Sequence, residues 1–173
     1  MDEKKKQRKI MIVKSNKILI ALFSVLANIS CHAQKMHTKQ ISKDIFGQPY
    51  IETQASQNKQ ILRQFWIDVN GERIELKQKL DKRPILYKDS LEFQLFVNKN
   101  LKMPIADVSG RVIVTILVGE TGKVQDYRII KAITKCDECI TNSRALINQL
   151  PQFQPAIANG QNVKSTYNLV IPF

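Results

Sequence analysis

Two cysteines lie at a spacing at which thiol chemistry occurs in proteins. Cys136 and Cys139 enclose Asp137 and Glu138, and the C-x-x-C group stands just before a stretch with helical periodicity. A reactive thiolate needs a stabilising setting such as a helix N-terminus, and this pair has one. The two acidic residues between the cysteines oppose thiolate formation. We therefore expect a local structural disulfide or two neighbouring thiols in preference to redox activity.

Other residues give little support for catalysis or metal binding. The only histidines are His32 and His37, close to the N-terminal segment, so a zinc site at the cysteines would lack further ligands. No Ser-His pairing or pair of carboxylates occurs in a setting typical of an enzyme. Glu120 lies in an expected turn, and acidic residues in the first turn of a helix are favourable without any function. The sequence predicts no enzyme, no cofactor and no metal.

The positive charge of the chain does not indicate a nucleic-acid partner. The formal net charge is +12, but residues 1–33 hold seven Lys and Arg side chains against two acidic ones. The remaining charges are scattered, without the basic runs and interleaved aromatic residues of a nucleic-acid surface. We expect no nucleic acid.

The N-terminal segment has the layout of an export signal. A basic region precedes an apolar run from Ile18 to Ile29, which is short for a membrane span, and cleavage after Ala33 fits the small-residue rule. We expect residues 1–33 to be a signal peptide, with Met1 or Met11 as the start. An uncleaved short anchor and lipidation at Cys31 stay open. Each alternative places the rest of the chain outside the cytoplasm, in the periplasm or anchored to a membrane that faces it.

Residues 34–83 are expected to form a linker followed by a β-hairpin. The stretch from Gln34 to about Glu52 is polar and poorly patterned. From Ile61 to Leu76, apolar residues flank Asn70-Gly71, a dipeptide that suits the positive φ angles of a type I′ turn. Because two strands alone are marginally stable, this hairpin needs a surface to dock on.

Residues 84–173 predict a second, α+β domain. Apolar residues at helical spacing follow a capping pair, Asp89 with Glu92, and Pro104 ends this helix. A hairpin follows from Gly110 to Ile133 with its turn at Gly119–Gly122, and its first strand is largely apolar on both faces. A helix precedes Pro151, and alternating residues form a strand from Val163 to Phe173. The order helix-strand-strand-helix-strand predicts two layers, a small antiparallel sheet packed under two helices.

These stretches resemble the C-terminal domain of TonB-type energy transducers in the form common in Bacteroidetes. The matching pieces occur in the order of the family: LFVNKNLKMP (Phe96–Pro104), GRVIVTILVGETGKVQDYRIIKAI (Gly110–Ile133), LPQFQPAIANGQNV (Leu150–Val163) and the ending YNLVIPF. The N-terminal half is not similar to a full transducer, since residues 34–83 lack a long proline-rich spacer. The resemblance implies a periplasmic domain that docks onto outer-membrane receptors, with inner-membrane motor proteins as further partners if the chain is anchored.

The resemblance also implies how docking occurs: an extended receptor segment adds as a strand beside an edge strand of the domain. We expect this edge in the terminal strand, with Lys164, Thr166 and Asn168 on its exposed face. The alternatives are that the strand is interior or is covered by the Ile61–Leu76 hairpin. A homodimer stays open. The full set of expected partner-binding residues is Lys164, Ser165, Thr166, Tyr167, Asn168, Leu169 and Val170.

The sequence therefore favours a periplasmic domain that binds outer-membrane transporter segments and contributes to energy-coupled transport. Two alternatives remain open. One is a periplasmic scaffold or interaction protein that uses the same fold without transmitting force. The other is a thiol–disulfide protein based on Cys136 and Cys139.

Overall fold

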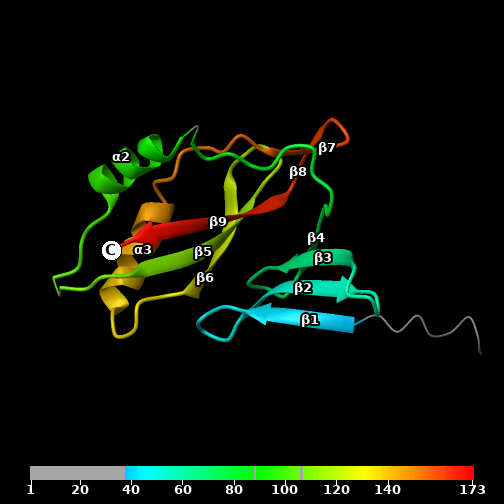
Figure 1. The fold of residues 1–173 in the computed structure, drawn as a ribbon, viewed down its shortest axis with the longest axis horizontal. Coiled ribbons are helices and arrows are strands. Elements are labelled where there is room, and N and C mark those ends of the chain that lie inside the picture. Colours follow the sequence, from blue (N-terminus) through cyan, green and yellow to red (C-terminus); the bar gives the residue numbers. More distant parts are fainter. Residues whose placement is uncertain (1–37, 88, 106) are drawn as a thin grey trace, which may run out of the picture. The chain divides into compact units, whose positions relative to one another are not determined.

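The structure, a computed structural model, describes residues 38–87, 89–105 and 107–173 (Figure 1). These residues fall in one structural unit, Thr38–Phe173. The expected signal peptide, its two alternatives and both histidines lie outside the described residues.

The described chain begins with a four-stranded antiparallel sheet in the order β1-β2-β3-β4. Its strands are β1 (Thr38–Lys43), β2 (Pro49–Ala55), β3 (Ile61–Ile67) and β4 (Arg73–Leu76). The prediction of a linker up to Glu52 is therefore wrong from residue 38 onward. β1 is an edge strand whose side chains are nearly all exposed, so it needs no alternating apolar residues and gives no strand pattern in the sequence.

The hairpin expected from Ile61 to Leu76 is present as β3 and β4, but its turn differs from the prediction. Only Gly71 has a positive φ, 83°. The carboxylate of Asp68 organises a longer turn, because its Oδ1 accepts hydrogen bonds from the backbone N–H groups of Asn70 and Glu72. The type I′ assignment at Asn70-Gly71 is therefore wrong.

The C-terminal part is an α+β fold with a three-stranded antiparallel sheet in the order β6-β5-β9. The elements occur in the chain as α2 (Ser90–Asn100), β5 (Arg111–Val118), β6 (Val124–Lys131), α3 (Asp137–Ile147), β7 (Ala156–Ala158), β8 (Gln161–Val163) and β9 (Ser165–Pro172). The short β7–β8 hairpin was not predicted. Its turn, Asn159-Gly160, has φ angles of 52° and 74°, as a type I′ turn requires.

One face of the three-stranded sheet packs against residues of both helices, as expected. The central strand contributes Val112, Val114, Ile116 and Val118, none of which is exposed. The same core contains Val97 from α2 and Leu146 from α3, among others. Asp89 caps α2, since its side chain accepts from the N–H of Glu92. The helix ends at Asn100, four residues before Pro104.

The opposite face of this sheet is also covered, so the two-layer prediction is incomplete. Leu117, 1% exposed, belongs to a second core together with Trp66, Tyr50 and Leu76 of the first sheet. The indole Nε1–H of Trp66 donates to Asp126 Oδ2 of β6 at 2.9 Å. This contact explains why β5 is apolar on both of its faces.

The turn between β5 and β6 touches the segment that leads to β7. Gly122 has a φ of 82°, and a Cβ atom there would lie 1.9 Å from the carbonyl oxygen of Phe153. The N–H of Phe153 donates to the carbonyl of Gly122 at 2.8 Å. Only glycine permits this approach.

Candidate functional site

β9 is an edge strand of its sheet, and the hydrogen bonds show which of its backbone groups point outward. Gly110 and Phe173 exchange two hydrogen bonds of 3.0 Å, and the β5–β9 register continues without a shift from Arg111–Pro172 to Val118–Ser165. In an antiparallel ladder such bonded pairs alternate with unbonded ones. The backbone groups of Ser165, Tyr167, Leu169 and Ile171 therefore face β5.

The N–H and C=O groups of Thr166, Asn168 and Val170 consequently point away from β5, along the free edge. No backbone hydrogen bond from these three residues to another described residue occurs outside the β5–β9 ladder. Pro172, the next outward position, has no N–H to offer, and proline is tolerated at such edge positions. The open ladder therefore has three donors, and it ends at Pro172.

The opposite edge of the same sheet, on β6, is occupied. The N–H of Ile45, in the turn between β1 and β2, donates to the carbonyl of Ile129 at 3.0 Å. The N–H of Tyr127 donates to Asp126 Oδ1, and the carbonyl of Tyr127 accepts from Arg128 Nη1. These outward backbone groups of β6 already have partners, whereas those of β9 have none among the described residues.

The side chains of the predicted docking residues alternate along β9. Ser165 and Leu169 are buried, Asn168 and Val170 are exposed, and Lys164, Thr166 and Tyr167 are intermediate. Tyr167 packs edge-on against Phe153 with the ring centroids 5.2 Å apart. The structure thus brings all seven residues to one edge, and of the three expected on the exposed face, Asn168 is exposed and Lys164 and Thr166 are half-buried.

A cleft of about 460 Å³ lies along the first half of this edge. Four consecutive residues, Ser165 to Asn168, line it. Since neighbouring residues of a strand point to opposite faces, the cleft follows the edge of β9. Its other walls come from Gln64 and Leu76 of the first sheet and from the segment Lys77–Pro84. This cleft was not predicted, because its walls come from segments far apart in the chain.

The hairpin β3–β4 therefore borders β9 without pairing with it. The prediction left open that this hairpin covers the terminal strand. Residues of β3 and β4 line the cleft beside β9, but among the described strands β4 pairs only with β3, and β9 pairs only with β5. The ladder of β9 stays accessible beside the hairpin.

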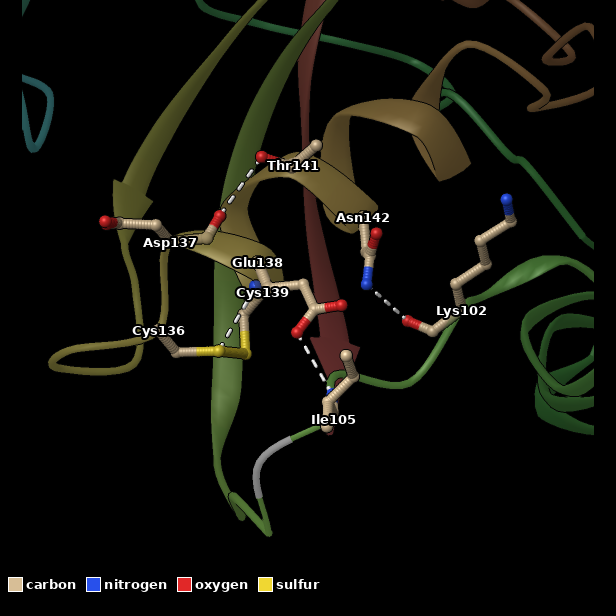
Figure 2. Close-up of a disulfide and its surroundings, with 8 residues drawn as sticks. All are labelled: Lys102, Ile105, Cys136, Asp137, Glu138, Cys139, Thr141 and Asn142. Atoms are coloured by element: carbon tan, nitrogen blue, oxygen red, sulfur yellow. Dashed lines mark hydrogen bonds between the residues drawn. A yellow bond between two sulfur atoms is a disulfide. The ribbon is translucent and has the colours of Figure 1, made fainter.

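Cys136 and Cys139 form a disulfide in the structure, at the start of α3 (Figure 2). Cys139 is fully buried, and its N–H donates to Cys136 Sγ at 3.2 Å. Figure 2 also shows Glu138 Oε2 accepting from the N–H of Ile105 at 3.0 Å. The disulfide thus fixes the beginning of α3, and the Glu138 hydrogen bond ties α3 to the segment that follows α2. Both contacts are structural.

A buried carboxylate lies away from this edge, in the four-stranded sheet. Glu52 is 2% exposed and forms ion pairs with Lys39 at 2.9 Å and Arg73 at 2.5 Å. The hydrogen-bonded ammonium of Lys39, supported by Gln54 and by the charge of Arg73, holds the pKa of Glu52 below its usual value. Because its charge is balanced inside the protein, this carboxylate is structural.

Two further observations concern the described residues only. In residues 38–87, 89–105 and 107–173, no three His, Cys, Asp or Glu side chains are placed to hold a metal ion. In the same part of the chain, neither helix has the length and apolar character needed to cross a membrane.

The fold and the edge define a class of small α+β domain with one open strand. Residues 105–173 match the family model of the Gram-negative bacterial TonB protein C-terminal. This segment is therefore similar to the TonB C-terminal family that the sequence motifs predicted. α2 and the motif Phe96–Pro104 precede the match. Searches of curated proteins and of solved structures found no match. The family is transport-related and non-enzymatic, its domains are periplasmic, and they interact with outer-membrane receptors.

Proposed function

We propose that this protein binds extended segments of outer-membrane transporters by strand addition to β9, and so contributes to energy-coupled transport. The observation that carries the proposal is the contrast between the two edges of the three-stranded sheet. On β6 the carbonyl of Ile129 and both backbone groups of Tyr127 are bonded within the protein, whereas the outward groups of Thr166, Asn168 and Val170 have no backbone partner among the described residues. The match of residues 105–173 to the TonB C-terminal family model supports the same partner.

Strand addition uses backbone groups for affinity and alternate side chains for preference. A partner strand on β9 has N–H donors at residues 166, 168 and 170 and carbonyl acceptors at the same positions. An exposed strand edge without a partner favours aggregation. At the β6 edge, by contrast, the carbonyl of Ile129 and the backbone groups of Tyr127 are bonded within the protein.

The test removes one outward donor and leaves the inner ladder intact. Asn168→Pro lacks the outward N–H, but the substitution also removes the side chain that accepts from Thr115 Oγ1 at 2.9 Å. Asn168→Ala is the matched control, because it loses the same side-chain contact and keeps the N–H. Full-length wild-type and variant proteins are used to capture transporters from outer-membrane extracts, with circular dichroism to confirm the fold.

We expect capture by Asn168→Ala to be close to wild type and capture by Asn168→Pro to fall at least tenfold, since one lost backbone hydrogen bond distorts its neighbours in the added strand. Equal capture by both folded variants would show that β9 is not the docking strand.

Energy transduction and scaffolding differ in whether the chain is attached to a membrane. A form that is fully released with the soluble periplasm cannot transmit force from an inner-membrane motor. Fractionation of cells that express the full chain separates the two functions, because the scaffold alternative permits a released protein and direct transduction requires an anchored one.

A further inference from the structure

The strand β1 has an open backbone edge in the first sheet, which lies outside the family match. The N–H of Asp44 donates to the carbonyl of Gln48 at 2.9 Å, so the backbone groups of Asp44 face β2. The bulge of this ladder adds a residue to β2 and none to β1, so the alternation along β1 is undisturbed. The backbone groups of Lys39, Ile41 and Lys43 therefore point away from β2.

These outward groups have no backbone partner in the part of the chain that the structure describes. No backbone hydrogen bond from Lys39, Ile41 or Lys43 to another described residue occurs outside the β1–β2 ladder. β1 contains no proline, so all three positions have an N–H donor and a carbonyl acceptor. The other edge strand of this sheet, β4, is only four residues long and has Arg73 and Glu75, of opposite charge, at its outward positions.

The side chains at the β1 edge give it a positive charge. Ile41 lies opposite Glu52 of β2, so Lys39, Ile41 and Lys43 share the face of the sheet on which Glu52 lies. Ile41 is 45% exposed and stands between the two lysines. Glu52 pairs with both Lys39 and Arg73, so two cations balance one carboxylate. Lys43 forms no ion pair with a described carboxylate.

These charges determine which kind of partner fits the edge. A cation, an apolar residue and a cation at every second position match an added strand that has two acidic side chains around an apolar one. A second copy of this chain fits poorly, because every antiparallel register of two β1 strands places lysines of the two copies opposite or diagonal to one another. The chain's own N-terminal segment is also basic, since residues 1–33 hold seven Lys and Arg against two acidic residues.

We propose that β1 binds an extended segment of a second protein in which two acidic side chains, four residues apart, flank an apolar residue. The segment adds as a fifth strand to the first sheet. Its backbone pairs with Lys39, Ile41 and Lys43, and its acidic side chains lie beside the two lysines. The inference does not rest on the proposed function, because β1 and β9 belong to different sheets (Figure 1). With both edges in use, the chain links two extended segments of other proteins.

The experiment uses two synthetic peptides with blocked termini and a fluorescent label, TETVTET and TQTVTQT. Both patterns are symmetric, so the same peptide presents its side chains correctly in either strand direction. Binding to the full-length protein is measured by anisotropy at low and high salt. Amide hydrogen exchange is measured residue by residue by NMR, in the free protein and with each peptide.

We expect TETVTET to bind about fivefold to tenfold more tightly than TQTVTQT, as two cross-strand charge pairs allow. The preference should shrink at high salt. It should fall to about threefold or less in Lys43→Gln, which leaves the Lys39–Glu52 ion pair intact. It should persist in the matched control Lys99→Gln, which removes a cation from α2.

Hydrogen exchange in the wild type identifies the strand to which the peptide adds. Binding of TETVTET should slow the amide exchange of Lys39, Ile41 and Lys43 at least tenfold, because these N–H groups become hydrogen-bonded. The inward amides of Gln40 and Ser42 should change little. Slower exchange at the outward amides of β9 alone would place the peptide there and overturn the proposal.

Two substitutions test the backbone contribution. Ile41→Pro removes one outward donor, and the matched control Ile41→Ala loses the same apolar contact and keeps the N–H. Affinity for TETVTET should fall at least tenfold in Ile41→Pro and stay within about threefold of wild type in Ile41→Ala. Asn168→Pro should bind TETVTET as tightly as wild type, which separates this edge from β9. Circular dichroism confirms the fold of each variant.

The remaining outcomes would overturn the proposal. If neither peptide changes exchange at β1, the lysines only protect an exposed edge from aggregation. If both peptides bind β1 equally, the acidic partner is wrong. If Lys39, Ile41 and Lys43 are protected without peptide, the chain itself occupies the edge. A second copy is then the occupant if this protection rises with protein concentration, and the N-terminal segment is the occupant if it does not. None of these results affects strand addition at β9.

Discussion

Trp66 joins the first sheet to the TonB-like domain, and its substitution by phenylalanine tests that connection. The indole is fully buried, and its N–H donates to the Asp126 carboxylate, which also accepts from Arg128 Nη1 at 2.6 Å. The ring of Trp66 meets Tyr50 edge-on at 5.8 Å between centroids. Trp66→Phe keeps an aromatic ring at this position and removes the donor.

The expected cost is about 3 kcal/mol of unfolding free energy. A hydrogen bond to a charged acceptor contributes about 1.5–3 kcal/mol, and the smaller ring buries less apolar surface, about 1 kcal/mol more. With a urea dependence of about 1–3 kcal/mol per molar, the midpoint should fall by roughly 1–3 M. Because the two sheets share a core, we expect one cooperative transition by circular dichroism.

A double-mutant cycle identifies the hydrogen bond. A neutral amide oxygen is a weaker acceptor than a carboxylate, so Trp66→Phe should cost about 1 kcal/mol less in an Asp126→Asn background. The reasoning is refuted if Trp66→Phe changes stability by less than about 0.5 kcal/mol, or if its cost is the same in both backgrounds within the error of additive sites. Two separate transitions in the wild type would contradict the shared core.

Three further substitutions test local features. The folded pKa of Glu52 is lowered, so its ionised form stabilises the fold at pH values above the unfolded pKa of about 4.5, and this stabilisation is lost as the pH falls through the folded pKa. In thermal melts, the melting temperature of the wild type should therefore fall more steeply on acidification than that of Glu52→Gln. The double variant Cys136→Ala, Cys139→Ala should lose about 2 kcal/mol in urea unfolding, the value for so short a loop, and equal stability would contradict a structural disulfide. Gly122→Ala should cost more than about 3 kcal/mol because positive φ adds to a backbone clash, and Gly160→Ala, with open space, only about 1 kcal/mol. Similar midpoints for the two glycine variants would argue against the clash.

Elements with a buried face were predictable from their periodicity. The helices, β5, β6 and the terminal strand all have alternating or helical apolar patterns, because each buries one side. β1 could not be found in this way, since its sequence TKQISK buries almost nothing. The apolar second face of β5 was visible in the sequence and indicated a cover on that side, but the sequence did not show that the first sheet provides it.

The two Asn-Gly pairs show why turn types were harder to predict. Asn159-Gly160 directly links two strands and adopts the type I′ angles. Asn70-Gly71 lies in a five-residue connection between Ile67 and Arg73, where the Asp68 side chain sets the geometry. The length of the connection between the two strands therefore determines which turn type an Asn-Gly pair adopts, and this length depends on where the strands end.

The terminal strand could be predicted from its alternating residues, whereas the cleft beside it could be found only from the fold. In the sequence, Lys77 and Arg83 belong to an ordinary polar connection. They line the cleft only because backbone hydrogen bonds to Ile157 and Gln154 hold this connection against the β7 region. Distant segments that meet around a strand leave no local pattern.

The occupied edge at β6 limits how far this sheet can grow. A second molecule could add at β6 only by displacing the bonds already made by the carbonyl of Ile129 and the backbone groups of Tyr127, so we expect assembly through this sheet to stop after a single step instead of propagating into a filament. Two copies that paired β9 with β9 across a two-fold axis would also use Thr166, Asn168 and Val170. Self-association through this strand and capture of a transporter are then mutually exclusive, and protein concentration alone would shift the balance between them.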